Sequence, residues 1–341
     1  MIKMKHKGLL LLLAGVAIIA LIIYLIGPGE IEKDLRRADP LYLLLALFIQ
    51  FVTFGLFTLR WSITTRAVGI NIKKRHLLPM LLVGMAINNL TPSARGGGEP
   101  VRAYILGKYS RTSMESSFAT VIADRGLDTF PFILLAIITI VSMILYFNLS
   151  IIWIISLLVA VILIIIVFLL ALYVSVDEEA GEKLANWTTN ILKRFYKRGH
   201  KKWGSRIKNA IMEFQDSMKI MLREKKVFIY GIPLSFLLWL LEILRVYLIF
   251  AAFGANAPIL VIAEVFIVAT LIGMLPLLPG GLGAIEGIMI ILYSAAGIPP
   301  SISAAVTVVE RLISFWMTSI LGVACLPYFG APVVKKLSEK L

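Results

Sequence analysis

Long apolar runs separated by short polar stretches dominate the pattern of this chain. Runs without a charged residue cover Gly8–Ile26, Leu41–Leu59 and Ile151–Val174, and a fourth run, Val227–Phe250, is apolar apart from a few residues that include Glu242 and Arg245. A transmembrane helix needs about 20 consecutive apolar residues, so each run predicts a membrane-spanning helix. The first run exceeds the apolar core of about 7–15 residues that a signal peptide carries, and no A-x-A cleavage site follows it. A retained membrane anchor is therefore favoured over a signal peptide.

A further apolar segment, Leu77–Leu90, is interrupted before it is long enough to cross. It leads into NNLTPSARGGGEPVRAYILG (88–107), in which Pro92, Gly96, Gly97, Gly98 and Pro100 fall within nine residues. Such a stretch cannot continue a helix. Inside a membrane, broken backbone is tolerated only within protein or beside a wet cavity. We therefore expect a re-entrant hairpin with Pro100–Lys108 in its returning arm, and two full but kinked crossings are the alternative.

A second interrupted stretch, LPLLPGGLGAIEGIMIILYSAAG (275–297), repeats this pattern. In both copies a proline is followed by a glycine four residues on and a glutamate seven residues on: Pro92, Gly96 and Glu99 in the first, Pro279, Gly283 and Glu286 in the second. The second break also contains Gly280 and Gly281. The two stretches are predicted to break their helices at equivalent positions.

Each copy also leads to an acid–arginine pair. These pairs are Asp124-Arg125, within VIADRGLDTF, and Glu310-Arg311, within VVERLISFW. The step from proline to arginine is 33 residues in the first copy (125 − 92) and 32 in the second (311 − 279). An internal repeat is predicted, with one copy at about 77–147 and the other at about 258–327. Chance matching of glycine and proline in apolar sequence is the competing explanation.

The basic residues predict which way the chain is threaded. Five basic residues and no acidic one lie in Arg60–His76, which is expected to be a cytoplasmic loop, whereas Gly27–Pro40 is expected outside. With this threading every strongly basic loop falls on one side, both termini are cytoplasmic, and the two repeats are inverted relative to each other. Inverted repeats with broken helices are typical of alternating-access transporters, whose substrate site lies where the repeats meet.

The one extended polar region is 177–226, with thirteen Lys/Arg and seven Asp/Glu. Apolar residues recur at steps of three and four from Ile207 to Met221, which predicts an amphipathic basic linker helix. Such a helix either lies on the anionic cytoplasmic leaflet or packs on the protein as a solvated connector.

Composition fits this picture. Hydrophobic residues make up 59% of the 341 residues and the mean hydropathy is +0.91, well above a soluble protein's apolar share of about 45–50%. We expect an all-α polytopic membrane protein forming one transmembrane domain over 1–341, with about 6–8 transmembrane helices including the two re-entrant or broken ones. The expected location is the cell membrane.

Several kinds of site find no support in the sequence. Cys325 is the one cysteine, the three histidines are far apart, and neither an HExxH nor a phosphate-loop motif occurs. No metal and no cofactor are therefore expected. The net charge of +14 is explained by the anionic leaflet surface, and nucleic acid is not expected as a partner.

Charged residues in the apolar regions are candidates for function because a charge at the bilayer centre costs at least about 2.5–3.5 kcal/mol. The candidate substrate-binding residues are Arg95, Glu99, Arg102, Asp124, Arg125, Asp128, Glu286, Glu310 and Arg311. Glu242 and Arg245 lie three residues apart on one helix face and are read as a structural pair or as part of the site. Buried salt bridges that fix helix packing are the alternative for all of them.

The motifs NNLTPSARGGGEPVRAYIL, ADRGLDTF, LPGGLGAIEG and VVERLISFW resemble the flippase-like transmembrane family typified by the membrane half of lysylphosphatidylglycerol synthase, the multiple peptide resistance factor. The resemblance extends from Leu9 to about Lys336. It implies movement of a lipid between leaflets: an aminoacylated phospholipid in the prototype, or a polyprenyl-linked sugar in related members. The prototype's soluble aminoacyl-transferase domain has no counterpart in this sequence, so we do not expect synthase activity.

The resulting hypothesis is a lipid translocase without an energy source of its own. An anionic or phosphate-linked lipid would bind at Arg102, Arg125 and Arg311, while Glu99 and Glu286 would counter these charges or hold a proton. One alternative is an intramembrane enzyme that modifies a lipid headgroup with Asp124 or Glu99 as base. Another is a non-catalytic membrane partner of a separate synthase or glycosyltransferase, docking through 177–226.

Overall fold

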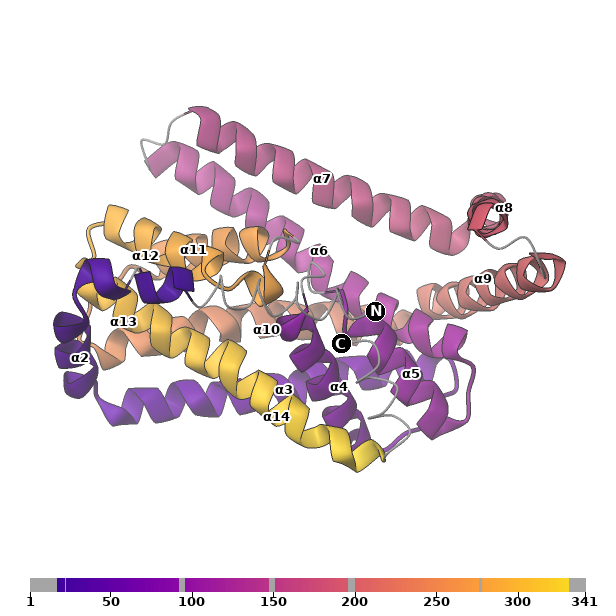
Figure 1. Ribbon diagram of the computed structural model, residues 1–341, viewed down its shortest axis with the longest axis horizontal. Helices are drawn as coiled ribbons and strands as arrows, with labels where there is room; N and C mark the ends of the chain where they lie inside the picture. Colours follow the sequence, from indigo (N-terminus) through magenta and orange to yellow (C-terminus); the bar gives the residue numbers. More distant parts are fainter. Residues whose placement is uncertain are drawn as a thin grey trace.

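The computed structural model describes residues 17–21, 23–91, 96–146, 151–195, 200–275 and 278–330. Throughout these ranges the chain is almost entirely helical, and they contain no β-strand (Figure 1). The predicted all-α membrane protein is thereby confirmed. An apolar helix, Ala17–Ile26, comes first, and most of the expected first span lies outside the described residues.

The remaining helices have the following bounds: α2 (Pro28–Arg37), α3 (Pro40–Ala67), α4 (Lys74–Leu90), α5 (Glu99–Ser110), α6 (Met114–Tyr146), α7 (Ile151–Val176), α8 (Glu178–Phe195), α9 (His200–Arg223), α10 (Lys225–Ala252), α11 (Ile259–Gly273), the 3-10 turn η1 (Pro279–Gly281), α12 (Ala284–Ala295), α13 (Pro300–Arg311), the π-helix η2 (Leu312–Met317), α14 (Thr318–Cys325) and the 3-10 turn η3 (Leu326–Phe329).

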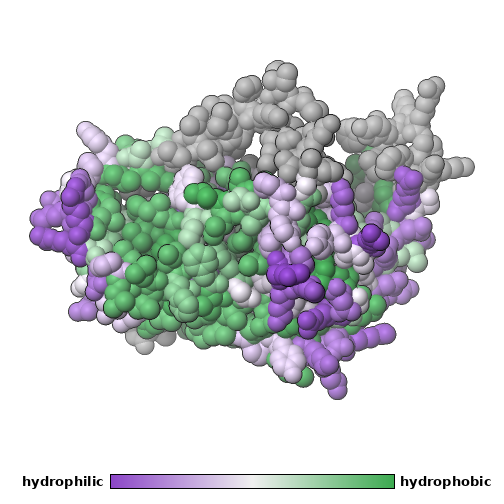
Figure 2. Space-filling model, turned by 90° about the horizontal axis from the view of Figure 1, so that it is seen from below, coloured by the Kyte–Doolittle hydropathy of each residue, from purple (hydrophilic) through white to green (hydrophobic). Residues whose placement is uncertain are grey.

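Five of the described helices are long and apolar enough to cross a membrane: α3, α6, α7, α10 and the continuous segment Pro300–Phe329. The most apolar of them is α7, which has a mean hydropathy of 3.6. On the face shown in Figure 2, hydrophobic side chains cover the middle of the molecule and hydrophilic ones gather toward the two ends. This is the surface expected of a protein whose middle lies in hydrocarbon.

Between the long helices lie two hairpins of short ones. In the first, α4 has 17 residues and α5 has 12, both short of the ~20 needed to cross. The Tyr109 hydroxyl, near the end of α5, lies 3.1 Å from Nδ1 of His76, near the start of α4. The hairpin therefore starts and ends at the same end of the molecule, which is the geometry of a re-entrant pair.

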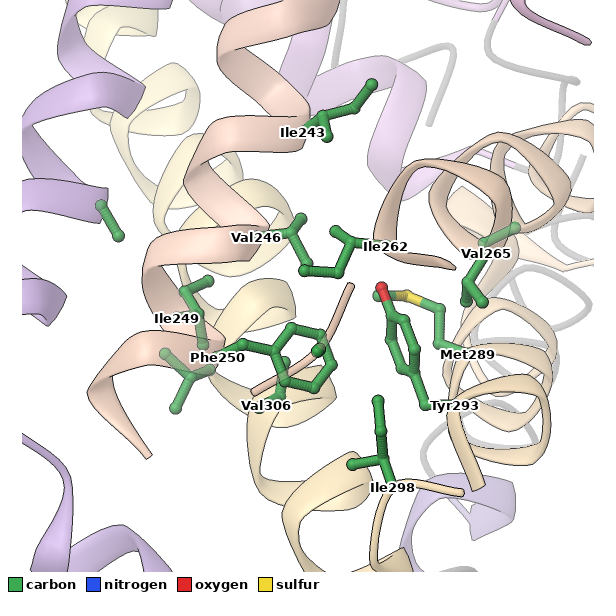
Figure 3. Close-up of a cluster of buried hydrophobic side chains, with 14 of the residues drawn as sticks. Ile243, Val246, Ile249, Phe250, Ile262, Val265, Met289, Tyr293, Ile298 and Val306 are labelled. Carbon is green, nitrogen blue, oxygen red and sulfur yellow. The ribbon is translucent and has the colours of Figure 1, made fainter. Parts of the chain in front are cut away.

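The second hairpin consists of α11, η1 and α12. Its open end is held by an apolar cluster in which Ile262 of α11 and Tyr293 of α12 pack against Phe250 of α10 (Figure 3). The Phe250 and Tyr293 rings meet edge to face at 4.8 Å. The start of α11 and the end of α12 thus also lie together.

The long helices α3 and α10 pack side by side and run antiparallel. The amide of Asp39, which caps α3, donates to the carbonyl of Ala252 at the end of α10, at 2.8 Å. Further along, Gln50 contacts Arg245 and Arg60 contacts Ser235. Each step forward on α3 therefore corresponds to a step back on α10.

Two segments expected to be loops are helical. The span that begins at Leu41 does not stop at Leu59, because α3 continues to Ala67, and Arg60 and Trp61 are buried within it. The expected outer loop Gly27–Pro40 contains α2. Pro28 occupies its first turn, Glu30 lies near its N-terminus and Arg36 in its last turn, an arrangement that suits the helix dipole.

The polar segment 177–226 forms two helices, α8 and α9, where one amphipathic helix was expected. Met218 and Met221 of α9 are buried against Ala119 of α6, so this part of the apolar stripe packs on the protein. Lys208 of α9 donates to Glu182 of α8 at 2.7 Å, and this hydrogen bond lowers the pKa of the Glu182 carboxyl. The connector is thus folded onto the transmembrane helices.

Candidate functional site

A buried arginine–carboxylate network connects α3, α5 and α6. Arg60 donates to Asp124 at 2.8 Å, to Asp128 at 2.7 Å and to the Ser235 hydroxyl at 2.9 Å. Asp124 also accepts a hydrogen bond from Arg102 at 3.1 Å. The Arg102 guanidinium lies 4.1 Å from the centroid of the Trp61 ring. Asp124 is therefore enclosed by two arginines within the helix bundle.

The second acid–arginine contact of this half joins the first hairpin to α6. Arg125 donates from Nε to Glu99 at 2.6 Å. Glu99 also accepts from the side-chain amide of Asn88 at 3.2 Å, and Asn88 in turn accepts from the Gly98 amide at 2.6 Å. Asn88 thus ties the last turn of α4 to the first residues of α5 across the helix break.

The other half of the chain builds a network from α10 and α13. Arg245 pairs with Glu242 at 2.6 Å and with Glu310 at 3.0 Å, and it also contacts the Gln50 side chain of α3. Arg311, next to Glu310, donates to Glu286 of α12 at 2.7 Å and to the Gly280 carbonyl in the break at 3.1 Å.

These contacts follow one scheme in both halves. An arginine on the antiparallel pair α3 and α10 (Arg60 or Arg245) holds the acid of the acid–arginine pair (Asp124 or Glu310). The neighbouring arginine of each pair holds the glutamate at the start of the returning short helix: Arg125 with Glu99, and Arg311 with Glu286. The spacing agrees, because Arg60 precedes Glu99 by 39 residues and Arg245 precedes Glu286 by 41.

Both networks border one cavity of about 200 Å³. Its charged lining comes from both halves of the chain: Arg60, Arg102, Asp124, Arg125, Asp128, Glu242, Arg245, Glu310 and Arg311. Along α6, Arg125 is eleven residues beyond Met114, which is about 16 Å of helix. Arg125 therefore lies well inside α6, away from both ends of the helix.

The arginine side chains of the two networks differ in how much of their surface is exposed. The side chains of Arg60 and Arg245 are each 1% exposed, that of Arg102 is 4% and that of Arg311 is 9%, whereas that of Arg125 is 37% exposed. Arg102 is held between Asp124 and Trp61, so it is poorly placed to meet a ligand. Arg125 is the best placed of the predicted phosphate-binding residues.

The short helices do not offer bare N-termini to a ligand. Glu99 is the first residue of α5, and the Glu286 carboxylate accepts from the Gly283 amide at the start of α12, at 2.6 Å. A carboxylate at a helix N-terminus is stabilised by the helix dipole. The chain's own glutamates therefore occupy the positions where the sequence pattern favoured a substrate anion.

The breaks of the two hairpins meet between the halves. The side-chain amide of Asn89, near the end of α4, donates to the Ser319 hydroxyl of α14 at 3.0 Å. The Gly280 backbone packs closely on Asn89: a Cβ on Gly280 would lie 2.8 Å from the Asn89 carbonyl oxygen. Arg311 is followed directly by the π-helix η2, and π-helical turns are frequent at functional sites.

Several predicted residues fall elsewhere or were missed. Pro92 and Arg95 lie outside the described residues, so neither can be placed. Arg60 was expected in a cytoplasmic loop, which is wrong, because it binds Asp124 in the interior. The available signal was the apolar pattern, which continues past Leu59 through Trp61. Nothing in the sequence marked Gln50 as a site residue. Its partner, Arg245, lies 195 residues away and is brought to it only by folding.

The family model described as "Lysylphosphatidylglycerol synthase TM region" matches residues 12–322. A UPF0104 membrane protein of Methanothermobacter thermautotrophicus is 65% identical over 99% of this chain and 100% of its own length. UPF0104 membrane proteins of Methanocaldococcus jannaschii (29% identical, covering 99% of this chain and 98% of the relative) and Pyrococcus horikoshii (28%, covering 93% and 95%) are similar over nearly their full lengths. This chain therefore belongs to the family of the lysylphosphatidylglycerol synthase transmembrane region.

Proposed function

We propose that this membrane protein moves a phosphate-bearing lipid between the two leaflets of the cell membrane, with the central cavity as the site that the headgroup crosses. The observation that carries the proposal is the convergence of two buried ion-pair networks on one cavity inside the bundle of apolar helices. Charges placed in hydrocarbon are expensive unless they serve a pathway or pair with one another. Here both networks pair their charges, and Arg125 of the first network remains 37% exposed.

The arrangement of the two halves supports alternating access. We infer that α3–α6 and α10–α14 are inverted repeats, since α3 and α10 run antiparallel and each half carries the same ion-pair scheme. In transporters of this kind the substrate site lies between the repeats and opens to either side as one repeat moves against the other. Lys73 and Lys108 mark the basic end of the molecule, which we assign to the cytoplasm.

The numbers of positive and negative side chains in the two networks narrow the choice of lipid headgroup. Among the described residues, the two networks contain five arginines (Arg60, Arg102, Arg125, Arg245 and Arg311) and six carboxylates (Glu99, Asp124, Asp128, Glu242, Glu286 and Glu310). The more accessible groups have both signs, since Asp128 and Glu242 are 18% and 17% exposed beside Arg125. A headgroup with a phosphate and an amine fits this mixture better than a purely anionic one.

Lipid-headgroup chemistry is less well supported than transport. A general base needs a free lone pair within hydrogen-bonding distance of the proton it removes. Asp124 is engaged through both carboxylate oxygens, by Arg60 and Arg102. Glu99 is held by Arg125 and Asn88 through one oxygen, and its other oxygen, which has no hydrogen-bond partner, belongs to a side chain that is only 7% exposed. We therefore propose that the chain acts by binding and moving its substrate without forming covalent bonds.

The direct test is lipid movement in proteoliposomes that contain the purified protein. The probe is a phosphatidylethanolamine with a fluorescent chain and an unmodified headgroup, followed by a headgroup reaction restricted to the outer leaflet. Replacing Arg125 or Arg311 by glutamine removes a charge-assisted hydrogen bond worth about 1.5–3 kcal/mol. We expect Arg125→Gln and Arg311→Gln to slow movement at least about tenfold. The matched control is Arg36→Gln, which removes an exposed arginine of α2. Equal rates in all variants would reject the central cavity as the route.

A further inference from the structure

A second and larger cavity, of about 800 Å³, lies beside the first. We call it the lateral groove. Its walls are the faces of α6 from Ile122 to Phe132, α7 from Leu163 to Ser175 and α10 from Val227 to Trp239, and residues of α9 also line it. Most of these lining residues are apolar, so the groove offers a surface suited to hydrocarbon.

The wall formed by α7 is a regular helix face. Its lining residues are Leu163, Ile164, Val167, Phe168, Ala171, Leu172 and Ser175, spaced three and four apart. In Figure 1, α7 runs along the edge of the bundle, with α6 between it and the other membrane helices. Only 6% of its most apolar stretch is buried. A helix so weakly packed leaves room for another apolar molecule against α6 and α10.

The dimensions of the groove suit a single hydrocarbon chain. From Ile122 to Phe132, α6 rises by about 15 Å, which is half the thickness of a ~30 Å hydrocarbon core and hence one leaflet. The groove lies between membrane-spanning helices and shares Arg125 with the charged cavity, which suits a hydrocarbon chain attached to a phosphate headgroup better than the helix of a partner protein.

The groove joins the charged cavity. Arg125, Asp128 and Trp239 line both cavities, and Gly96 and Glu99 reach the groove from the first hairpin. Arg125 is the most exposed of the network arginines, and one carboxylate oxygen of its partner Glu99 has no hydrogen-bond partner. The lateral groove therefore reaches an arginine that is partly exposed and whose partner carboxylate has one oxygen without a hydrogen bond.

We propose that the lateral groove binds the hydrocarbon chain of a lipid whose phosphate group contacts Arg125. The lipid enters between α6, α7 and α10, keeps its chain against these apolar faces, and presents its headgroup to the central cavity. This inference rests on the proposed function and deepens it, because it assigns the headgroup and the chain of one substrate to different cavities.

The experiment compares two ligands with the same headgroup. Delipidated protein in detergent is titrated with dioleoyl phosphatidylethanolamine and, separately, with water-soluble glycerophosphoethanolamine, which lacks the chains. Ala171→Trp and Val167→Trp fill the groove from α7, and Leu170→Trp is the matched control on a side of α7 that does not line it. We expect the two groove variants to bind the dioleoyl lipid about tenfold more weakly and the water-soluble compound unchanged. Leu170→Trp should bind both as the unmodified protein does.

A third variant separates failure of this inference from failure of the proposed function. Arg125→Gln should weaken binding of both ligands. If it does so while Ala171→Trp and Val167→Trp bind the dioleoyl lipid normally, the groove assignment is overturned and the central site stands. If Arg125→Gln also binds both ligands normally, the proposed headgroup site fails too. A change of oligomeric state in the groove variants without a change in lipid binding would identify the groove as a protein interface and overturn the inference.

Discussion

Arg60 and Arg245 are the most deeply buried charged side chains of the two networks, each 1% exposed. Each lies inside a long helix and binds the acid of one acid–arginine pair. A buried ion pair adds little stability compared with an apolar pair of the same shape, but removal of one partner leaves an uncompensated charge in the interior. The arginines therefore make the carboxylates tolerable in the interior of the helix bundle.

Arg60→Ala leaves Asp124 with only Arg102 and leaves Asp128 with the 4.0 Å contact to Arg125. We expect the free energy of unfolding to fall by about 3–5 kcal/mol, seen as a lower Tm in detergent. Arg36→Ala, which removes an exposed pair on α2, should change stability by at most about 1 kcal/mol. A Tm for Arg60→Ala as high as that of Arg36→Ala would contradict the role assigned to Arg60.

Gly98 offers a second test at the residue scale. A Cβ on Gly98 would lie 1.9 Å from the carbonyl oxygen of Gly84, because the backbones of α4 and α5 touch there. Forcing atoms into such a contact typically costs about 1–3 kcal/mol or more. We expect Gly98→Ala to lower the Tm in detergent.

The control for this prediction is Gly55→Ala in α3, where a Cβ meets nothing within 4 Å. Alanine favours a helix interior by about 0.5–1 kcal/mol over glycine, so this variant should be neutral or more stable. If the two variants behave alike, the close contact between α4 and α5 is refuted.

At the scale of elements, the short helices are what separate this protein from a simple bundle. Helices of 12 to 17 residues cannot cross alone, so each hairpin depends on its neighbours for burial. Asn88 and Glu286 satisfy backbone amides at the breaks, as buried polar groups in a membrane require. The hairpins thus carry non-helical backbone into the helix bundle without leaving these amides unpaired.

If both hairpins are re-entrant, the two ends of each hairpin are accessible from the same side of the membrane. In a Cys325→Ala background, single cysteines at Lys73 and Lys108 flank the first hairpin, and cysteines at Asn256 and Ala295 flank the second; all four positions are exposed. A membrane-impermeant maleimide should label the first pair from one side and the second pair from the other. Labelling of Lys73→Cys and Lys108→Cys from opposite sides would show that α4 and α5 both cross, and would exclude the re-entrant hairpin.

At the scale of the whole molecule, the proposed lipid movement leads to a prediction about headgroup preference. With six carboxylates and five arginines among the described network residues, an amine-bearing headgroup should move faster than a purely anionic one. Glu242→Gln makes the numbers equal and removes one of the more accessible negative groups. We expect this variant to lose preference for phosphatidylethanolamine over phosphatidylglycerol several-fold in proteoliposomes.

The control for lipid preference is Glu32→Gln on α2, which removes an exposed carboxylate far along the chain from the cavity. It should leave the ratio of the two rates unchanged. A Glu242→Gln variant with the same ratio as the control would mean that the charge balance of the cavity does not select the headgroup.

The sequence by itself determined the membrane class, the long helices and the places where helices break. These follow from local chemistry: apolar length predicts spanning helices, and glycine and proline interrupt them within a few residues. The acid–arginine pairs were also visible, since a charge in an apolar run stands out against its neighbours.

Only the tertiary structure decided which charges meet. Arg60 resembled part of a basic loop, and its pairing with Asp124 depends on α3 packing against α6 across 64 residues of chain. The same is true of Gln50 and Arg245, which are 195 residues apart and meet because α3 and α10 run antiparallel. The spacing of apolar residues along one helix predicts which side of that helix is buried. It does not predict which other helix packs on that side, because the contacting helices are distant in sequence.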